Sequence, residues 1–115
     1  MGRAIAVGFA REGCSNIAVG DLDSAELEET QNVLRSYSKS LSIEAITLDL
    51  TDETSTASFF QKAIDKFGRV DFLANIASYE PPLAGAHEIE ETDFDEAFSS
   101  NQKAVGAPGS LFIMR

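Results

Sequence analysis

Residues 17–21, Ile-Ala-Val-Gly-Asp, form a short apolar run that ends on a carboxylate, and residues 43–49, Ile-Glu-Ala-Ile-Thr-Leu-Asp, end in the same way. The first run shows no alternation of apolar and polar residues, which is typical of a strand buried on both faces of a parallel sheet. The second run is rich in β-branched residues, which favour strands. Two predicted strands therefore end in aspartates, Asp21 and Asp49.

Helical patterns flank the first of these strands. Residues 2–11 place their apolar side chains on one helical face, and Gly13 stands where such a helix would end. After the strand, Asp23 followed three positions later by Glu26 resembles a capping box, the reciprocal pair of hydrogen bonds that begins a helix. We expect this second, amphipathic helix to run to about Ser38.

The same alternation continues beyond the second strand. Either Thr51 or Asp52 is placed to cap a third helix, whose apolar residues recur at intervals of three and four. Gly68 would end this helix in a left-handed conformation. Residues 70–77, Val-Asp-Phe-Leu-Ala-Asn-Ile-Ala, then predict a third buried strand.

The remaining residues predict a loop and one more helix. Residues 78–86 contain two prolines and predict the loop. Thr92, followed by Asp95, begins a helix that extends through Asn101, and residues 106–109, Gly-Ala-Pro-Gly, would end it. Because strands alternate with helices, we predict an α/β fold: a doubly wound parallel sheet with helices on both faces, in one domain over residues 1–115.

Composition limits the partners. Hydrophobic residues make up 43% of the chain and charged residues 24%, the balance of an ordinary globular domain. Nineteen acidic against nine basic residues give a formal charge of −10, which repels phosphate backbones and anionic lipid. We therefore expect neither nucleic acid nor a membrane as a partner. A dinucleotide stays compatible with this charge, because backbone N–H groups at a helix N-terminus can hold a phosphate.

The cysteine content and the hydropathy of the sequence indicate whether a metal site and a membrane or secretion segment are expected. Cys14 is the only cysteine, so an intrachain disulfide is excluded, and the sequence offers no zinc-ligand cluster and hence no expected metal site. Arg11 and Glu12 interrupt the opening apolar stretch too early for a signal peptide, and no apolar run reaches membrane-spanning length. The expected location is cytoplasmic.

The order of these segments resembles the short-chain dehydrogenase/reductase family over residues 2–105. In that family a glycine-rich turn after a first strand opens a helix, and residues 2–6, Gly-Arg-Ala-Ile-Ala, are similar to the residues after the last glycine of that turn. The resemblance implies that Gly2 and its neighbours contact the cofactor pyrophosphate. It also implies a chain truncated at both ends, a partial Rossmann-like sheet whose first strand is missing, and a divergent tail over residues 106–115.

The missing strand has a structural consequence. In the family's strand order it lies between the strands that correspond to residues 17–21 and 70–77. We expect either a gap of about two strand spacings, roughly 10 Å, or direct pairing of these two strands. Either arrangement reduces the buried apolar core, so we predict that the chain is only marginally stable.

The resemblance also implies the cofactor. Asp21 matches the acidic residue that accepts hydrogen bonds from the adenosine ribose. Because Leu22 offers no cation for a 2′-phosphate, the implied cofactor is NAD rather than NADP. Asp49 and Leu50 match a segment whose aspartate meets the adenine amino group.

Two further segments resemble motifs of the family, and the first of them departs from its motif at two positions. Residues 71–78 resemble the family's Asn-Asn-Ala-Gly stretch and place Asn75 and Ala77 at the cofactor, although Ile76 and Ser78 depart from it. Asn101 resembles the asparagine of the catalytic tetrad. The tetrad serine and Tyr-x-x-x-Lys lie further along in relatives, and the tyrosines here have leucine four positions later: Tyr37 with Leu41, and Tyr79 with Leu83.

Ordinary structural explanations exist for each residue taken singly, because aspartate suits the turn after a strand and asparagine suits loops and helix surfaces. The joint order of four matched segments favours the family. Two functions stay open. The first is an NAD(P)-dependent oxidoreductase that interconverts a small alcohol and a carbonyl compound and forms a homo-oligomer, and the second is a non-catalytic nucleotide-binding or subunit-interacting remnant. In the isolated chain we expect no turnover, because the proton donor is missing.

Overall fold

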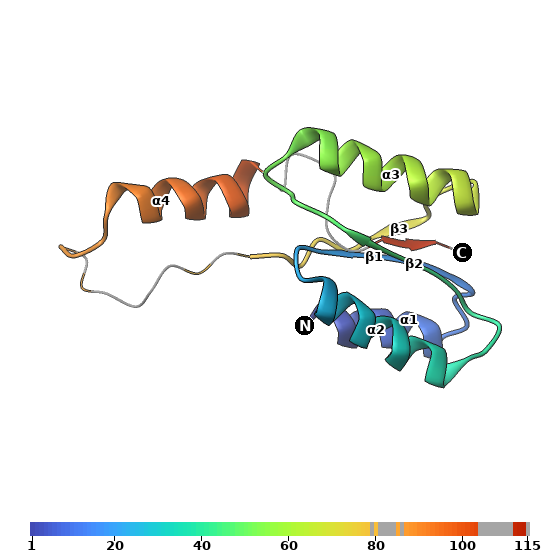
Figure 1. Cartoon of the computed structure of the whole chain (residues 1–115). Helices are drawn as coiled ribbons and strands as arrows, with labels where there is room; N and C mark the ends of the chain where they lie inside the picture. The colour runs from blue at the N-terminus through green and yellow to red at the C-terminus, as the bar shows by residue number, and fades with distance from the viewer. Residues whose placement is uncertain (79, 81–84, 86, 104–111, 115) are drawn as a thin grey trace.

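The computed structural model describes residues 1–78, 80, 85, 87–103 and 112–114. Helices and strands alternate along most of this length, as the sequence predicts (Figure 1). In chain order the elements are α1 (Gly2–Arg11), β1 (Asn16–Asp21), α2 (Ser24–Tyr37), β2 (Ser42–Thr47), α3 (Glu53–Phe67), β3 (Phe72–Leu73), α4 (Glu91–Phe98), the π-helix η1 (Ser99–Lys103) and β4 (Phe112–Met114).

The sheet is covered on both faces, which confirms the predicted layers. α1 and α2 lie on one face and α3 lies on the other (Figure 1). Successive residues of β1 point in opposite directions, so Ile17 and Val19 pack with α1 and α2 while Ala18 packs with α3. Because β1 is buried on both sides, its continuous apolar sequence is explained.

Aspartates begin two of the helices. The Asp23 carboxylate accepts hydrogen bonds from the N–H groups of Ala25 and Glu26, at 2.8 and 3.2 Å, and caps α2. The reciprocal half of the predicted capping box is wrong: the Asp23 N–H donates to the Asp21 carboxylate, and the Glu26 carboxylate pairs with Arg3.

Asp52, rather than Thr51, caps α3. Its carboxylate accepts a hydrogen bond from the N–H of Thr54 at 2.9 Å. At the other end of α3, Gly68 has φ of 86°, a left-handed conformation that glycine adopts without steric cost. Both helix ends therefore follow from local sequence.

The sheet has the strand order β2-β1-β4-β3, and the prediction of a wholly parallel sheet is wrong. β1 and β2 are parallel, but β4 runs antiparallel to both of its neighbours, with Ile113 opposite Ile17 on one side and Phe72 on the other. β3 is consequently parallel to β1. Neither the expected gap nor the direct pairing of residues 17–21 with 70–77 occurs, because the C-terminal strand occupies the position between them. A buried strand edge needs hydrogen-bond partners, and β4 supplies them.

The predicted buried strand over residues 70–77 is also wrong. Only Phe72 and Leu73 form β3, and their exposed fractions are 57% and 47%. Its two residues pair with Ile113 and Phe112 of β4. Phe72 contacts the ring of Phe9, with centroids 5.7 Å apart, yet remains mostly in solvent.

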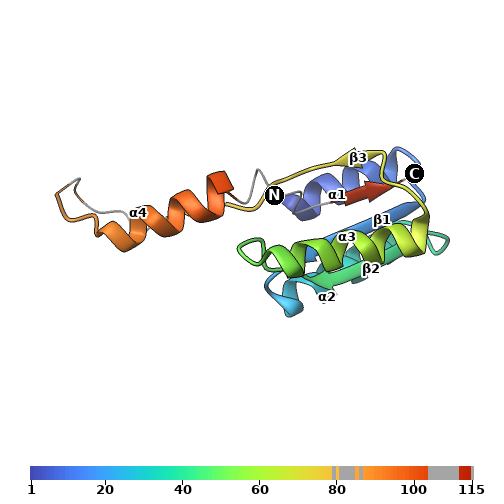
Figure 2. The same ribbon diagram turned by 90° about the horizontal axis from the view of Figure 1, so that it is seen from above.

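α4 projects away from the sheet (Figures 1 and 2). It begins at Glu91 rather than after the predicted cap Thr92, because Glu90 is its N-cap residue. None of its residues is buried, and Phe94 and Phe98 stack on each other at 6.3 Å. The molecule is therefore elongated, with extents of 52 × 26 × 22 Å.

Two predictions cannot be compared fully with the structure. Most of the predicted loop over residues 78–86 and the predicted helix end at residues 106–109 lie outside the described residues. Within the described part of the chain, no helix is long and apolar enough to cross a membrane.

The position of β4 leads to a stability prediction. Ile113→Pro removes a backbone N–H from a strand that has neighbours on both sides, so we expect the free energy of unfolding to fall by about 2 kcal/mol. Urea denaturation followed by circular dichroism measures this change. Ile113→Val keeps the N–H and the β-branched side chain and is the control. Equal urea midpoints for the two variants would show that β4 does not complete the sheet in solution.

Candidate functional site

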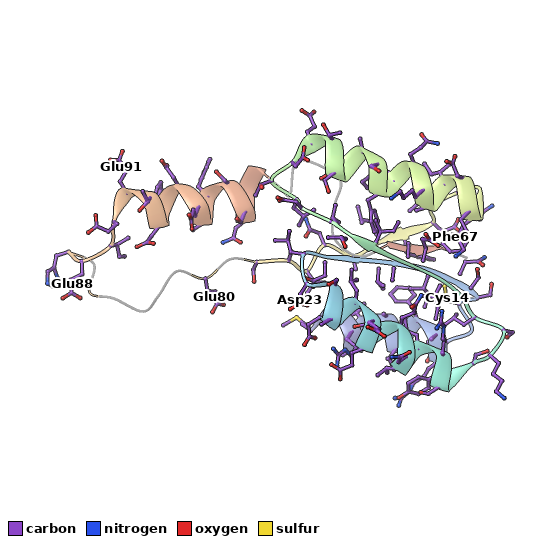
Figure 3. All side chains as sticks on the ribbon, in the orientation of Figure 1. Cys14, Asp23, Phe67, Glu80, Glu88 and Glu91 are labelled. Atoms are coloured by element: carbon purple, nitrogen blue, oxygen red, sulfur yellow. The ribbon has the colours of Figure 1, made fainter. Side chains whose placement is uncertain are left out.

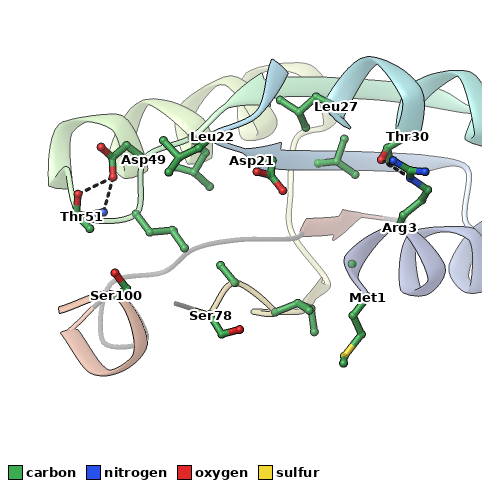
Figure 4. A pocket seen from close by; sticks show the side chains of 17 residues that line it. Met1, Arg3, Asp21, Leu22, Leu27, Thr30, Asp49, Thr51, Ser78 and Ser100 are labelled. Carbon is green, nitrogen blue, oxygen red and sulfur yellow. Dashed lines mark hydrogen bonds between the residues drawn. The ribbon is translucent and has the colours of Figure 1, made fainter. Parts of the chain in front are cut away.

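A cavity of about 530 Å³ opens at the carboxyl ends of β1 and β2 (Figure 4). In a parallel sheet covered by helices, this edge is where ligands generally bind. The wall combines the ends of both strands, the start of α1 and residues 76–78. Its polar side chains come from Arg3, Asp21, Thr30, Asp49, Thr51, Ser78 and Ser100, and its apolar side chains from Met1, Val19, Leu22, Leu27, Leu48, Leu50, Ile76 and Ala77.

Asp21 is the last residue of β1 and is held there by the sheet. It stands opposite Thr47 in the parallel ladder, and its carbonyl oxygen accepts a hydrogen bond from the N–H of Leu48 at 2.9 Å. One of its carboxylate oxygens, Oδ1, accepts the N–H of Asp23 at 3.1 Å. Because an ionised carboxylate can accept about four hydrogen bonds, the exposed Asp21 side chain retains capacity for a ligand.

Asp49 lies just beyond β2 and is oriented by Thr51. Its Oδ1 atom accepts hydrogen bonds from the Thr51 N–H at 2.8 Å and from the Thr51 hydroxyl at 2.6 Å (Figure 4). The Asp49 N–H donates to Ser55 Oγ at 3.0 Å, which attaches the turn to α3. The hydroxyl of Thr51 first, and its N–H second, lower the pKa of the Asp49 carboxyl. Asp49 is therefore an acceptor, not a donor, at neutral pH.

The third part of the wall is the beginning of α1. Met1 is the N-cap residue and makes no side-chain capping bond, while Gly2 and Arg3 line the cavity. A helix leaves its first N–H groups without partners inside the helix, and its dipole favours negative charge there. A phosphate group placed beside Gly2 would be stabilised by both effects.

The Arg3 side chain connects α1 to α2 at the cavity wall. Its Nε donates to Thr30 Oγ1 at 3.0 Å, and Nη2 pairs with Glu26 at 2.6 Å. Nη1 pairs with Glu29 at 2.8 Å, so all three guanidinium nitrogens have partners. Arg3 is the one Arg, Lys or His side chain that lines the cavity in the part of the chain that the structure describes.

Most of the predicted site residues meet at this cavity. Gly2, Asp21, Asp49, Leu50 and Ala77 all line it, although they come from separate segments of the chain. Their predicted roles in cofactor binding remain predictions.

The two predicted asparagines do not line the cavity. Asn75 follows β3, and Asn101 lies in η1, where its neighbour Ser100 reaches the wall instead. Both asparagines make contacts within the chain. The sequence does not predict the π-helix over Ser99–Lys103, in which Ser100 lines the cavity and Asn101 does not.

Sequence reasoning missed Arg3 and Thr30. The available signal was the spacing of Glu26, Glu29 and Thr30, which share one face of α2, but nothing in the sequence names α1 as the helix that this face meets.

No group of three or more metal-ligating side chains occurs among the residues with described positions. The site is built from two carboxylates, the Arg3 guanidinium, hydroxyl groups, one helix N-terminus and apolar side chains.

Two parallel strands connected through a helix, which end at a ligand-sized cavity beside a helix N-terminus, are typical of Rossmann-like α/β proteins. The family model described as short chain dehydrogenase matches residues 1–108. The chain belongs to the short-chain dehydrogenase/reductase family.

One relative is similar in sequence and another in fold. The 2-dehydro-3-deoxy-D-gluconate 5-dehydrogenase of Dickeya dadantii is 30% identical over 106 residues, which are 91% of this chain and 39% of that protein. The crystal structure of levodione reductase superposes with a TM-score of 0.87 at 24% identity and covers 92% of this chain and 41% of that one. The chain thus spans about two fifths of the length of these relatives.

A third relative was solved with a cofactor. The 3-ketoacyl-(acyl-carrier-protein) reductase from Brucella melitensis, in complex with NADH, superposes with a TM-score of 0.77 at 25% identity. The alignment covers 92% of this chain and 40% of that one.

The hydrogen bonds at Asp49 lead to a pH prediction. Thr51→Val removes the hydroxyl donor, so we expect the pKa of Asp49 to rise toward its ordinary value. Because the folded-state pKa is lowered, the stabilisation by Thr51 is present above the unfolded-state pKa and is lost as the pH falls through the folded-state pKa. Carboxyl titration by NMR measures the change. Thr54→Val, in which the capping N–H is kept, is the control, and an unchanged Asp49 pKa in Thr51→Val would contradict the assignment.

Proposed function

We propose that this chain binds the adenosine part of NAD and belongs to an oxidoreductase that transfers a hydride between the cofactor and a small alcohol or carbonyl compound. One observation carries the proposal: Asp21 and Asp49, at the ends of neighbouring parallel strands, line the same cavity as the N-terminus of α1. An adenosine nucleotide needs acceptors for its hydroxyl and amino groups, apolar contacts for its ring and donors for its phosphate. The cavity offers each of these.

Most of the predicted residues have a role in this proposal. Asp21 accepts hydrogen bonds from the ribose hydroxyls, and Asp49 accepts one from the adenine amino group. Leu50 and Ala77 contact the adenosine through apolar surface, and the N–H groups at Gly2 hold the pyrophosphate. The resemblance predicts that Asn75 binds the cofactor, but Asn75 does not line the cavity, and we propose no direct contact between it and the adenosine.

NAD is preferred over NADP on electrostatic grounds. A 2′-phosphate on the ribose would lie beside the Asp21 carboxylate and be repelled. Leu22, the next residue, is 66% exposed and has no charge to compensate. The relative from Brucella melitensis was solved with NADH and the actinorhodin polyketide ketoreductase with NADPH, so the preference proposed for this chain rests on Asp21 and Leu22.

Proton transfer is the part that this chain supports least. By resemblance, Asn101 helps hold a proton-relay water, and the family's proton donor is the tyrosine of Tyr-x-x-x-Lys, a spacing that neither Tyr37 nor Tyr79 matches. The Tyr37 hydroxyl accepts a hydrogen bond from Arg11, at the ends of α1 and α2 that lie away from the cavity. Tyr79 lies outside the described residues. We therefore propose nucleotide binding without turnover for the 115-residue chain. We also propose that the protein is cytoplasmic and that it forms homo-oligomers.

The experiment is nucleotide binding by isothermal titration calorimetry, with AMP as the probe. We expect saturable binding by the wild-type chain, and Asp21→Ala and Asp49→Ala each to weaken it by about tenfold or more, because each removes a charged acceptor. Asp95→Ala, on α4 and outside the cavity, removes the same charge and is the matched control.

Two results would contradict this proposal. Failure of the wild-type chain to bind AMP, or equal weakening in Asp95→Ala, would remove the adenosine site. Reduction of a carbonyl compound by the purified chain with NADH, followed by the loss of NADH absorbance, would show that turnover needs no residue beyond those present.

A further inference from the structure

Arg3 is a cation in the cavity wall that the proposed adenosine site does not use. Its side chain is 31% exposed and lies in the same cavity as Asp21 (Figure 4). A guanidinium group at this place would ordinarily attract a phosphate, because its fork of donors matches phosphate oxygens. The bonds that Arg3 already makes decide whether it can do so.

Two carboxylates and a hydroxyl from α2 occupy the Arg3 guanidinium. Glu26 and Glu29 are three positions apart and therefore lie on one face of the helix, with Thr30 beside them. Glu29 receives bonds from both terminal nitrogens of Arg3, at 2.8 Å from Nη1 and 3.0 Å from Nη2. Two negative charges against one positive charge leave the group formed by Arg3, Glu26 and Glu29 net negative.

We propose that Glu26 and Glu29 determine cofactor specificity by withholding Arg3 from a 2′-phosphate. The inference rests on the proposed function, and it extends the specificity beyond Asp21 and Leu22. A dinucleotide without a 2′-phosphate needs no cation at the ribose and tolerates the occupied Arg3. One with a 2′-phosphate meets the Asp21 carboxylate and a guanidinium whose nitrogens are already bonded.

The positions of these side chains suggest how strong the effect is. Glu26 and Glu29 are 61% and 59% exposed, so water screens their attraction to Arg3. Neutralising the two glutamates is therefore expected to release the Arg3 guanidinium. Figure 3 shows α1 and α2 on the same side of the sheet, and the two helices contact each other. An Arg3 side chain released from Glu26 and Glu29 still belongs to the first turn of α1, which lines the cavity. We expect a moderate change in specificity and an intact fold.

The test compares AMP with adenosine 2′,5′-bisphosphate, which differ only in the 2′-phosphate. Glu26→Gln/Glu29→Gln should improve the affinity for the bisphosphate relative to AMP by about tenfold over wild type. Glu12→Gln/Glu28→Gln removes the same two charges from exposed positions outside the cavity and is the matched control. Adding Arg3→Met to the first variant should abolish the gain.

The outcomes separate the two proposals. If wild type does not bind AMP, the adenosine site and the specificity proposal both fall. If AMP binds and the affinity ratio is the same in Glu26→Gln/Glu29→Gln as in the control, the specificity proposal alone is overturned. Circular dichroism checks the fold of each variant. If the double variant unfolds, the single variant Glu29→Gln, which keeps the Glu26 ion pair, takes its place. It should show a smaller increase in the affinity for the bisphosphate relative to AMP.

Discussion

The parallel register between β1 and β2 sets the geometry of the site. Asp21 stands opposite Thr47, and the Leu48 N–H continues the ladder by donating to the Asp21 carbonyl. Both strands therefore end at the same level, and the chain turns away from each at an aspartate. A slip by one residue would turn the buried side chains of β1 to the wrong face, so core packing and site geometry are determined together.

Close packing behind β1 reinforces this register. A Cβ atom at Gly20 would lie 2.7 Å from Leu48 Cδ2 and 2.8 Å from Phe59 Cε2, distances that real contacts do not reach. Phe59 of α3 is fully buried, so it cannot easily move aside. Glycine at position 20 lets the strand approach α3 closely, one residue before the carboxylate that faces the cavity.

Local patterns in the sequence predict the first two strands, the first three helices and the aspartate caps, because these elements depend on neighbouring residues. They also place Asp21 and Asp49 at one edge of the sheet, since parallel strands share their carboxyl ends. β4 could not be predicted in this way. Residues 112–114, Phe-Ile-Met, are a short apolar run, but their place between β1 and β3 depends on pairing with residues far away in the sequence.

The carboxyl edge of β1 and β2 and the start of α1 together form one nucleotide site in this interpretation of the structure. Two-dimensional amide NMR during a titration with AMP can locate that site residue by residue. We predict the largest shifts at the backbone amides of Gly2, Leu22 and Leu50, with those of Tyr37 and Gly68, at the other end of the helices, unchanged. Shifts centred on Tyr37, on Gly68 or on α4 would contradict the interpretation.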